Sequence, residues 1–226
     1  MHWYFSLRSP YSWLAHHDLL HRYPETAARV EWRMFFEPDD QSLTALRSAR
    51  GDFPYVAMSR AKHFYILQDV RRLAADRGLE VAWPIDRQPR WEVPHLAYLV
   101  AADAGRGREF IDAVYRARWQ QGRDICDPAT MASLAADLSL DPKMLTGAAE
   151  DPERRAAGVR ALLAVHRDGV FGVPFFVAGR EKFWGIDRLP AFVAATAAVP
   201  SDVAEPPAEP HRASMGADQG HAGGCG

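Results

Sequence analysis

The two ends of this 226-residue chain carry strand patterns, and the long stretch between them carries helical ones. Residues 2–7 alternate in hydrophobicity, which predicts a strand, and residues 30–36 alternate in the same way. Between them, Ser9 suits an N-cap and Pro10 suits the first position of a helix that we expect to run to about Arg22. A strand, a helix and a strand of these lengths predict a right-handed βαβ unit with a parallel pair of strands.

A second strand pattern lies near the other end of the chain. Residues 175–178 and 182–184 are separated by Gly179-Arg180, which predicts a β-hairpin. We expect Asp187 to cap a last helix after this hairpin. A βαβ unit followed by ββα predicts an α/β protein with a thioredoxin-like fold, and the helical stretch between the two halves then forms a large insertion.

The middle of the chain has apolar residues at helical spacing. We expect helices around residues 66–74, 94–104, 110–120 and 159–166, and short helices that begin at Pro128 and Pro142. We therefore assign residues 1–54 and 168–198 to a thioredoxin-like domain and residues 55–167 to a helical insertion domain. Residues 199–226 have almost no large apolar side chain, which predicts a disordered tail.

Composition and charge exclude several function classes. The formal net charge of −2 provides no basic field for nucleic acid, and no apolar run is long enough for a membrane span. Cys126 and Cys225 are far apart in the sequence and do not form a disulfide framework, so we expect a cytoplasmic protein. The sequence has neither Cys-x-x-Cys nor His-Glu-x-x-His, and we expect no metal site.

The segment Ser9-Pro10-Tyr11-Ser12 is the first candidate for chemistry. Thioredoxin-type oxidoreductases carry Cys-x-x-Cys at this place, after the first strand. With serines instead, the segment cannot exchange disulfides, but it still places a hydroxyl at a helix N-terminus, where anions are favoured. The simpler interpretation is that Ser9 is only an N-cap.

The segment Gly172-Val173-Pro174, directly before the hairpin, is the second candidate. An X-Pro bond that enters a strand is a candidate cis peptide bond. In a thioredoxin fold such a loop lies beside the first helix, and the backbone of the residue before the proline can pair with an extended thiol peptide. The simpler interpretation is a trans proline at the start of an edge strand.

In three segments the chain resembles the 2-hydroxychromene-2-carboxylate isomerase family, which is similar to kappa-class glutathione transferases within the DsbA-like branch of thioredoxin folds. The segments are YFSLRSPYSWLA at residues 4–15, VFGVP at 170–174 and FWGIDR at 183–188. Lys62-x-x-Tyr65-x-x-x-Asp69 and residues 122–125 resemble the helical block of that family more weakly. The resemblance covers residues 2 to 195.

The resemblance implies that the protein binds glutathione or an equivalent low-molecular-weight thiol. The sulfur of this thiol would lie near Ser9, which is the implied catalytic residue. The remaining implied thiol-binding residues are Val173, Pro174 in a cis bond, Trp184, Asp187 and Lys62. Aromatic side chains are candidates to line an apolar pocket for a small-molecule substrate, although they are equally suited to a core: Tyr11, Trp13, Phe35, Phe36, Phe64, Tyr65 and Trp119. A homodimer is expected by analogy.

The leading hypothesis from the sequence is therefore a thiol-dependent isomerase that acts on an unsaturated, aromatic-type compound. The thiolate would add to an activated C=C bond, the resulting single bond would rotate, and elimination would restore the alkene. Three alternatives remain: a transferase of the kappa type, a non-redox protein that binds extended peptides, and a disulfide exchanger that uses Cys126 and Cys225.

Overall fold

A mixed four-stranded sheet forms the centre of the computed structural model, which describes residues 1–54 and 58–197. The strand order is β2 (Glu31–Met34), β1 (His2–Phe5), β3 (Phe175–Ala178) and β4 (Glu181–Trp184). β1 is parallel to β2, whereas β3 is antiparallel to both of its neighbours. The parallel pair and the hairpin predicted from the sequence are confirmed, and with them the α/β thioredoxin-like fold.

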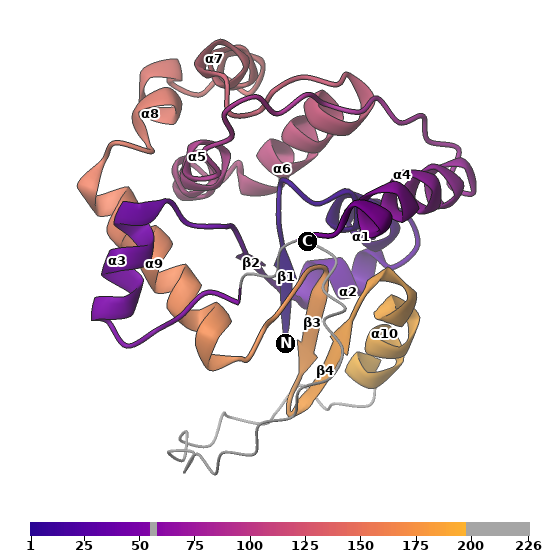
Figure 1. The fold of residues 1–226 in the computed structure, drawn as a ribbon. Helices are drawn as coiled ribbons and strands as arrows, with labels where there is room; N and C mark the ends of the chain where they lie inside the picture. Colours follow the sequence, from indigo (N-terminus) through magenta and orange to yellow (C-terminus); the bar gives the residue numbers. More distant parts are fainter. Residues whose placement is uncertain (55–57, 198–226) are drawn as a thin grey trace.

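Helices lie between β1 and β2 and between β2 and β3, and another follows β4 (Figure 1). The elements near the N-terminus are α1 (Pro10–His21), α2 (Pro24–Arg29) and α3 (Asp40–Ser48). The helical block comprises α4 (Arg60–Ala75), α5 (Glu92–Asp103), α6 (Gly107–Tyr115), the π-helical turn η1 (Arg116–Gln120), α7 (Pro128–Asp137), α8 (Pro142–Gly147) and α9 (Pro152–Arg167). The chain ends with η2, a 3₁₀ turn (Ile186–Arg188), and α10 (Leu189–Ala197). Figure 1 shows α3 beside α9, and α10 beside the β3–β4 hairpin.

Local sequence signals explain most of the helix starts. Ser9 caps α1, and an aspartate followed by proline begins each of α7, α8 and α9. The sequence analysis missed α2 and α3. α2 is short and has no side-chain cap, whereas α3 begins at a clear cap, because Asp39 accepts a hydrogen bond from the backbone N–H of Ser42 at 2.9 Å.

The alternation along the strands sends aromatic side chains to both faces of the sheet. Trp3, Phe5 and Phe176 belong to the large core beneath one face. Tyr4 and Phe175 belong to a smaller apolar cluster on the other face. Apolar side chains therefore cover both faces of the sheet.

The described residues, 1–54 and 58–197, contain no helix long and apolar enough to cross a membrane. The predicted tail, residues 199–226, lies outside the described part of the chain.

Candidate functional site

Ser9 lies at the N-terminus of α1, as the sequence predicts. Its Oγ accepts a hydrogen bond from the backbone N–H of Ser12 at 3.2 Å, and the residue is 1% exposed. Within the described residues, the hydroxyl proton of Ser9 has no acceptor. The side chain therefore combines a capping role with a hydrogen-bond donor that is still available, next to the positive end of the helix dipole.

The Val173–Pro174 peptide bond is cis, as expected. Because β1 and β3 are antiparallel with Tyr4 opposite Phe175, the turn after β1 and the segment before β3 lie at the same end of the sheet. Neither the N–H nor the C=O of Val173 has a hydrogen-bond partner in the described structure. Val173 thus offers a backbone donor and acceptor at the end of the sheet where α1 begins.

An aromatic cluster lies on the Val173 side of the sheet. Phe35 and Val173 belong to the same apolar cluster, and Trp184 packs against it. Phe171 is 48% exposed, and its ring centroid lies 5.0 Å from that of Trp184. The sequence analysis did not single out Phe171, although its place directly before Gly172-Val173-Pro174 is a signal that was available.

Helix α4 contributes the next group of predicted residues. Lys62, Tyr65 and Asp69 share one face of this helix because they are spaced by three and four residues. The hydroxyl of Tyr11 donates to Asp69 Oδ2 at 2.8 Å, so this face of α4 is held against α1. Tyr65 is 56% exposed, and Lys62 is half-buried with no ion-pair partner in residues 1–54 and 58–197.

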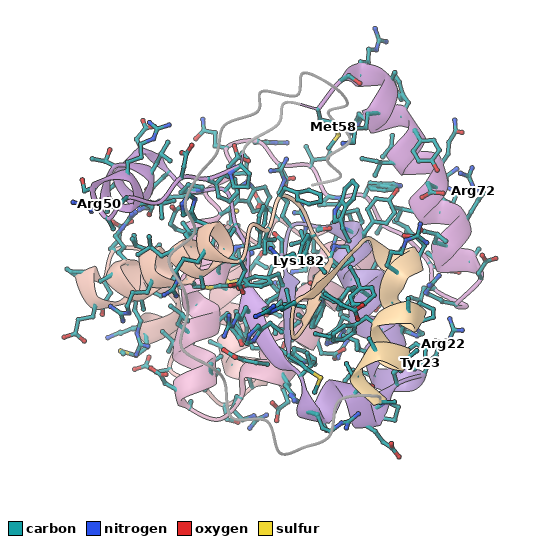
Figure 2. The ribbon with its side chains drawn as sticks, turned by 90° about the horizontal axis from the view of Figure 1, so that it is seen from below. Arg22, Tyr23, Arg50, Met58, Arg72 and Lys182 are labelled. Carbon is teal, nitrogen blue, oxygen red and sulfur yellow. The ribbon has the colours of Figure 1, made fainter. Side chains whose placement is uncertain are left out.

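The outer side of α4 is polar. Figure 2 shows α4 at the periphery of the molecule, with Arg72 on its outer side. Arg72 forms an ion pair with Asp69 at 3.0 Å, so that carboxylate binds both the tyrosine of α1 and an arginine of its own helix. Asp69 therefore links α4 to α1.

The prediction that Asp187 caps the last helix is wrong. Asp187 lies inside η2, and Gly185 takes the capping position with φ +98°, a conformation that favours glycine. The Asp187 carboxylate is exposed and pairs with Arg188 at 3.2 Å. It remains a candidate to bind a charged group, but it does not cap a helix.

Several other candidate aromatic residues belong to the core. Trp13 and Trp119 stack with ring centroids 6.3 Å apart, and Phe36 is 1% exposed. Tyr11 and Phe35 are also buried, at 7% and 8% exposed. Of the aromatic residues proposed for the substrate, Tyr65 and Phe64 are exposed, and Phe171 joins them as an exposed ring.

The thiol of Cys126 is poorly suited to disulfide exchange. It donates to the backbone carbonyl of Arg90 at 3.3 Å, and burial raises the pKa of this thiol to about 12. A thiol with that pKa is protonated at neutral pH and is a weak nucleophile. Cys225, its proposed partner, lies outside the described residues.

Three side chains of the helical block contact the turn that precedes Ser9, and the sequence analysis named none of them for this role. They are His95, Tyr115 and Arg118. Each lies more than 80 positions away in the sequence from the backbone group that it binds, so no local pattern could reveal the contact.

Comparison with known proteins agrees with this architecture. A model of the DSBA-like thioredoxin domain matches residues 2–197. The chain belongs to this family. The 2-hydroxychromene-2-carboxylate isomerase of Sphingobium xenophagum is 27% identical over 188 residues, which are 82% of this chain and 92% of the relative. The resemblance inferred from the sequence is thereby confirmed.

Solved structures share the DSBA-like fold. The structure of a 2-hydroxychromene-2-carboxylate isomerase aligns with a TM-score of 0.67 at 21% identity, and the match covers 87% of this chain and 93% of that chain. A probable DsbA oxidoreductase from Streptomyces coelicolor aligns with a TM-score of 0.64 at 21% identity over 90% and 93% of the two chains. At these identities the structural matches establish the fold.

Proposed function

We propose that this DSBA-like protein is a thiol-dependent isomerase that uses glutathione or an equivalent low-molecular-weight thiol. The observation that carries the proposal is the hydroxyl donor of Ser9 at the start of α1. It lies at the same end of the sheet as the backbone N–H and C=O of Val173, which have no partner within the described residues. The isomerase relative, at 27% identity, supports the reaction class.

The donor set fits a small thiol peptide. Such a ligand carries a thiol, an extended amide backbone and charged ends. The hydroxyl of Ser9 suits the sulfur, and the free N–H and C=O of Val173 suit the ligand backbone. The ammonium of Lys62 suits a carboxylate end, and the exposed carboxylate of Asp187 suits an amino end.

A thiol bound here would supply the nucleophile that adds reversibly to an activated C=C bond, permits rotation about the resulting single bond and leaves by elimination. The residues of this chain would favour the anionic sulfur before that step. Ser9 donates a hydrogen bond toward it, and the N-terminus of α1 adds a favourable dipole. Both effects lower the pKa of a bound thiol from its usual value near ~8.5.

The aromatic cluster around Val173 suits an unsaturated aromatic compound. Phe171 and Trp184 present ring surface beside the proposed thiol site, and Phe35 fills the space behind them. Flat rings favour stacked or edge-on contacts of this kind. The substrate would thus lie between this cluster and the exposed ring of Tyr65 on α4.

The proposal is tested by following 2-hydroxychromene-2-carboxylate in the presence of the protein, with and without reduced glutathione. We expect isomerisation that requires both protein and thiol, with the thiol recovered unchanged. A stable thioether adduct detected by mass spectrometry would instead favour a transferase. Binding of extended peptides without any thiol requirement, together with no turnover, would favour a peptide-binding protein.

A further inference from the structure

A fully buried histidine of α5 binds the turn between β1 and α1. The backbone N–H of Leu7 donates to His95 Nε2 at 3.0 Å, and the hydroxyl oxygen of Ser6 lies 3.4 Å from the same nitrogen. On the opposite side of the ring, Nδ1 lies 2.7 Å from the carbonyl oxygen of Trp91. One imidazole ring therefore links the turn that leads to Ser9 to the first turn of α5.

These partners allow a single protonation state of the ring. A carbonyl oxygen can only accept, so the proton must lie on Nδ1 of His95. A backbone N–H can only donate, so Nε2 must carry a lone pair toward Leu7. Protonation of Nε2 would replace this hydrogen bond by two facing donors and would remove the contact between His95 and the N–H of Leu7.

Other groups hold the same turn as well, among them Ser12 Oγ, which accepts from the backbone N–H of Ser6 at 3.3 Å. The hydroxyl of Tyr115 donates to the carbonyl of Ser6 at 3.0 Å, and Nε of Arg118 lies 3.4 Å from the carbonyl of Arg8. Both groups bind carbonyls, whereas His95 supplies the acceptor for the N–H of Leu7. His95 thus has a role in the turn that Tyr115 and Arg118 do not share.

We infer that His95 is a positioning residue, which acts through its unprotonated Nε2 to fix the turn over residues 6–9 and with it the direction of the Ser9 hydroxyl. The inference about the turn stands on these contacts, while its consequence for catalysis rests on the proposed function. His95 does not touch the thiol site itself, since it binds Leu7 and Ser6 from below the turn.

The surroundings of the ring keep it neutral. His95 is 0% exposed, and burial lowers its pKa to about 3. The carbonyl of Trp91 opposes this effect, while the guanidinium groups of Arg118 and Arg8 reinforce it. The hydrogen bond to Leu7 should therefore persist through the whole range in which a thiol enzyme works.

A measurement without any thiol tests the inference directly. Nitrogen chemical shifts of the full-length protein labelled with ¹⁵N-histidine should show one ring protonated at Nδ1 that does not titrate between pH 8 and pH 5. Substitution of His95→Gln identifies that signal by its loss. A His95 ring protonated at Nε2, or one that titrates with the exposed histidines, would overturn the inference.

A pair of variants then tests the consequence for Ser9. In His95→Gln the side-chain amide can place an oxygen near the position of Nε2, whereas in His95→Asn it reaches only to the position of Nδ1. We expect the Asn variant to raise the pKa of bound glutathione and to lower kcat by about 10- to 100-fold, and the Gln variant to recover most of both. Equal pKa values for the thiol in the two variants would contradict a positioning role.

The two tests separate failure of the inference from failure of the proposed function. If the wild-type protein binds no glutathione, the proposed function fails, and the ring protonation still decides whether His95 holds the turn. If the ring has the expected state but the variants bind and react like the wild type, the turn is held by His95 without any effect on Ser9, and the positioning role is overturned.

Discussion

The Oγ of Ser9 accepts a hydrogen bond from the backbone N–H of Ser12 at 3.2 Å, and its own proton has no acceptor within residues 1–54 and 58–197. Replacement of Ser9 by alanine removes both functions. We expect the loss of the cap to lower the free energy of unfolding by about 1 kcal/mol, measured by urea denaturation. We also expect turnover of the thiol-dependent reaction to fall sharply and its pH optimum to rise.

A matched variant separates these two effects. Asp141 caps α8 in the same way, with proline at the next position, and accepts from the backbone N–H of Lys143 at 2.9 Å. Asp141→Ala should cost a similar free energy of unfolding and leave turnover and its pH profile unchanged. Equal loss of turnover in both variants would show that Ser9 acts through stability alone.

An ion pair between Asp39 and Arg155 connects the start of α3 to α9, and we expect it to stabilise the fold. Arg155 Nη1 and Nη2 donate to the two carboxylate oxygens of Asp39 at 3.1 and 2.7 Å. Partial burial opposes ionisation, but the Arg155 guanidinium and the Ser42 N–H hold the pKa of Asp39 well below its usual range. Arg155→Met should therefore lower the free energy of unfolding by about 2–4 kcal/mol, measured by chemical denaturation.

The neighbouring arginine provides the control for that prediction. Arg154 pairs with Asp103, whose side chain is 67% exposed. Because exposed pairs contribute little, Arg154→Met should cost less than about 1 kcal/mol. Similar costs for the two variants would show that the Asp39–Arg155 pair has no special role.

The pattern of successes and failures from the sequence has physical causes. The strands at both ends and the start of α1 are encoded locally, by alternation and by Ser9-Pro10, and these predictions are confirmed. The capping role of Asp187 failed because Gly185, with φ +98°, begins a 3₁₀ turn two residues earlier. The sequence predicted a carboxylate cap, whereas the structure has a glycine there with no side-chain hydrogen bond to the helix start.

The sequence patterns did not predict the contacts between distant segments. In the sequence, nothing distinguishes His95 from any other polar residue of a largely apolar helix. Its hydrogen-bond partner Leu7 lies 88 positions away. Asp69 was noticed as part of a motif, but its hydrogen bond to Tyr11 became visible only when α4 was placed against α1. The sequence indicated candidate residues for the chemistry, whereas the contacts that hold them in place became visible only in the fold.

Acid should destabilise the protein through His16. This side chain is 3% exposed, and burial lowers its pKa to about 4 despite the opposing effect of Asp112. Because the folded pKa lies below the usual 6.5, this contribution to stability is complete above pH 6.5 and is lost as the pH falls toward 4. Between pH 7.5 and pH 5 we expect His16 to account for a loss of about 2 kcal/mol.

The pH dependence of urea denaturation checks this prediction. His16→Gln should flatten the dependence between pH 7.5 and pH 5. The remaining slope should come mainly from His95, whose pKa burial also lowers. An identical slope in wild type and His16→Gln would refute the assignment.

The affinity for a thiol peptide should depend on Lys62. Its ammonium is half-buried on the face of α4 that Asp69 holds against α1, and it is our candidate for a ligand carboxylate. Lys62→Met should weaken glutathione binding by about 1 kcal/mol, roughly fivefold in Kd, with a smaller effect on a thiol that lacks the carboxylate. Lys143→Met, at an exposed position on α8, should leave Kd unchanged.

The central claim is that Ser9 and the start of α1 stabilise the anionic form of a bound thiol. Calorimetric titration with reduced glutathione, combined with ultraviolet absorbance of the thiolate, tests it most directly in wild type and Ser9→Ala. We predict that wild type binds glutathione with a gain of thiolate absorbance near neutral pH, and that Ser9→Ala binds without that gain. Binding with equal thiolate absorbance in both proteins, or no binding to wild type, would contradict the account.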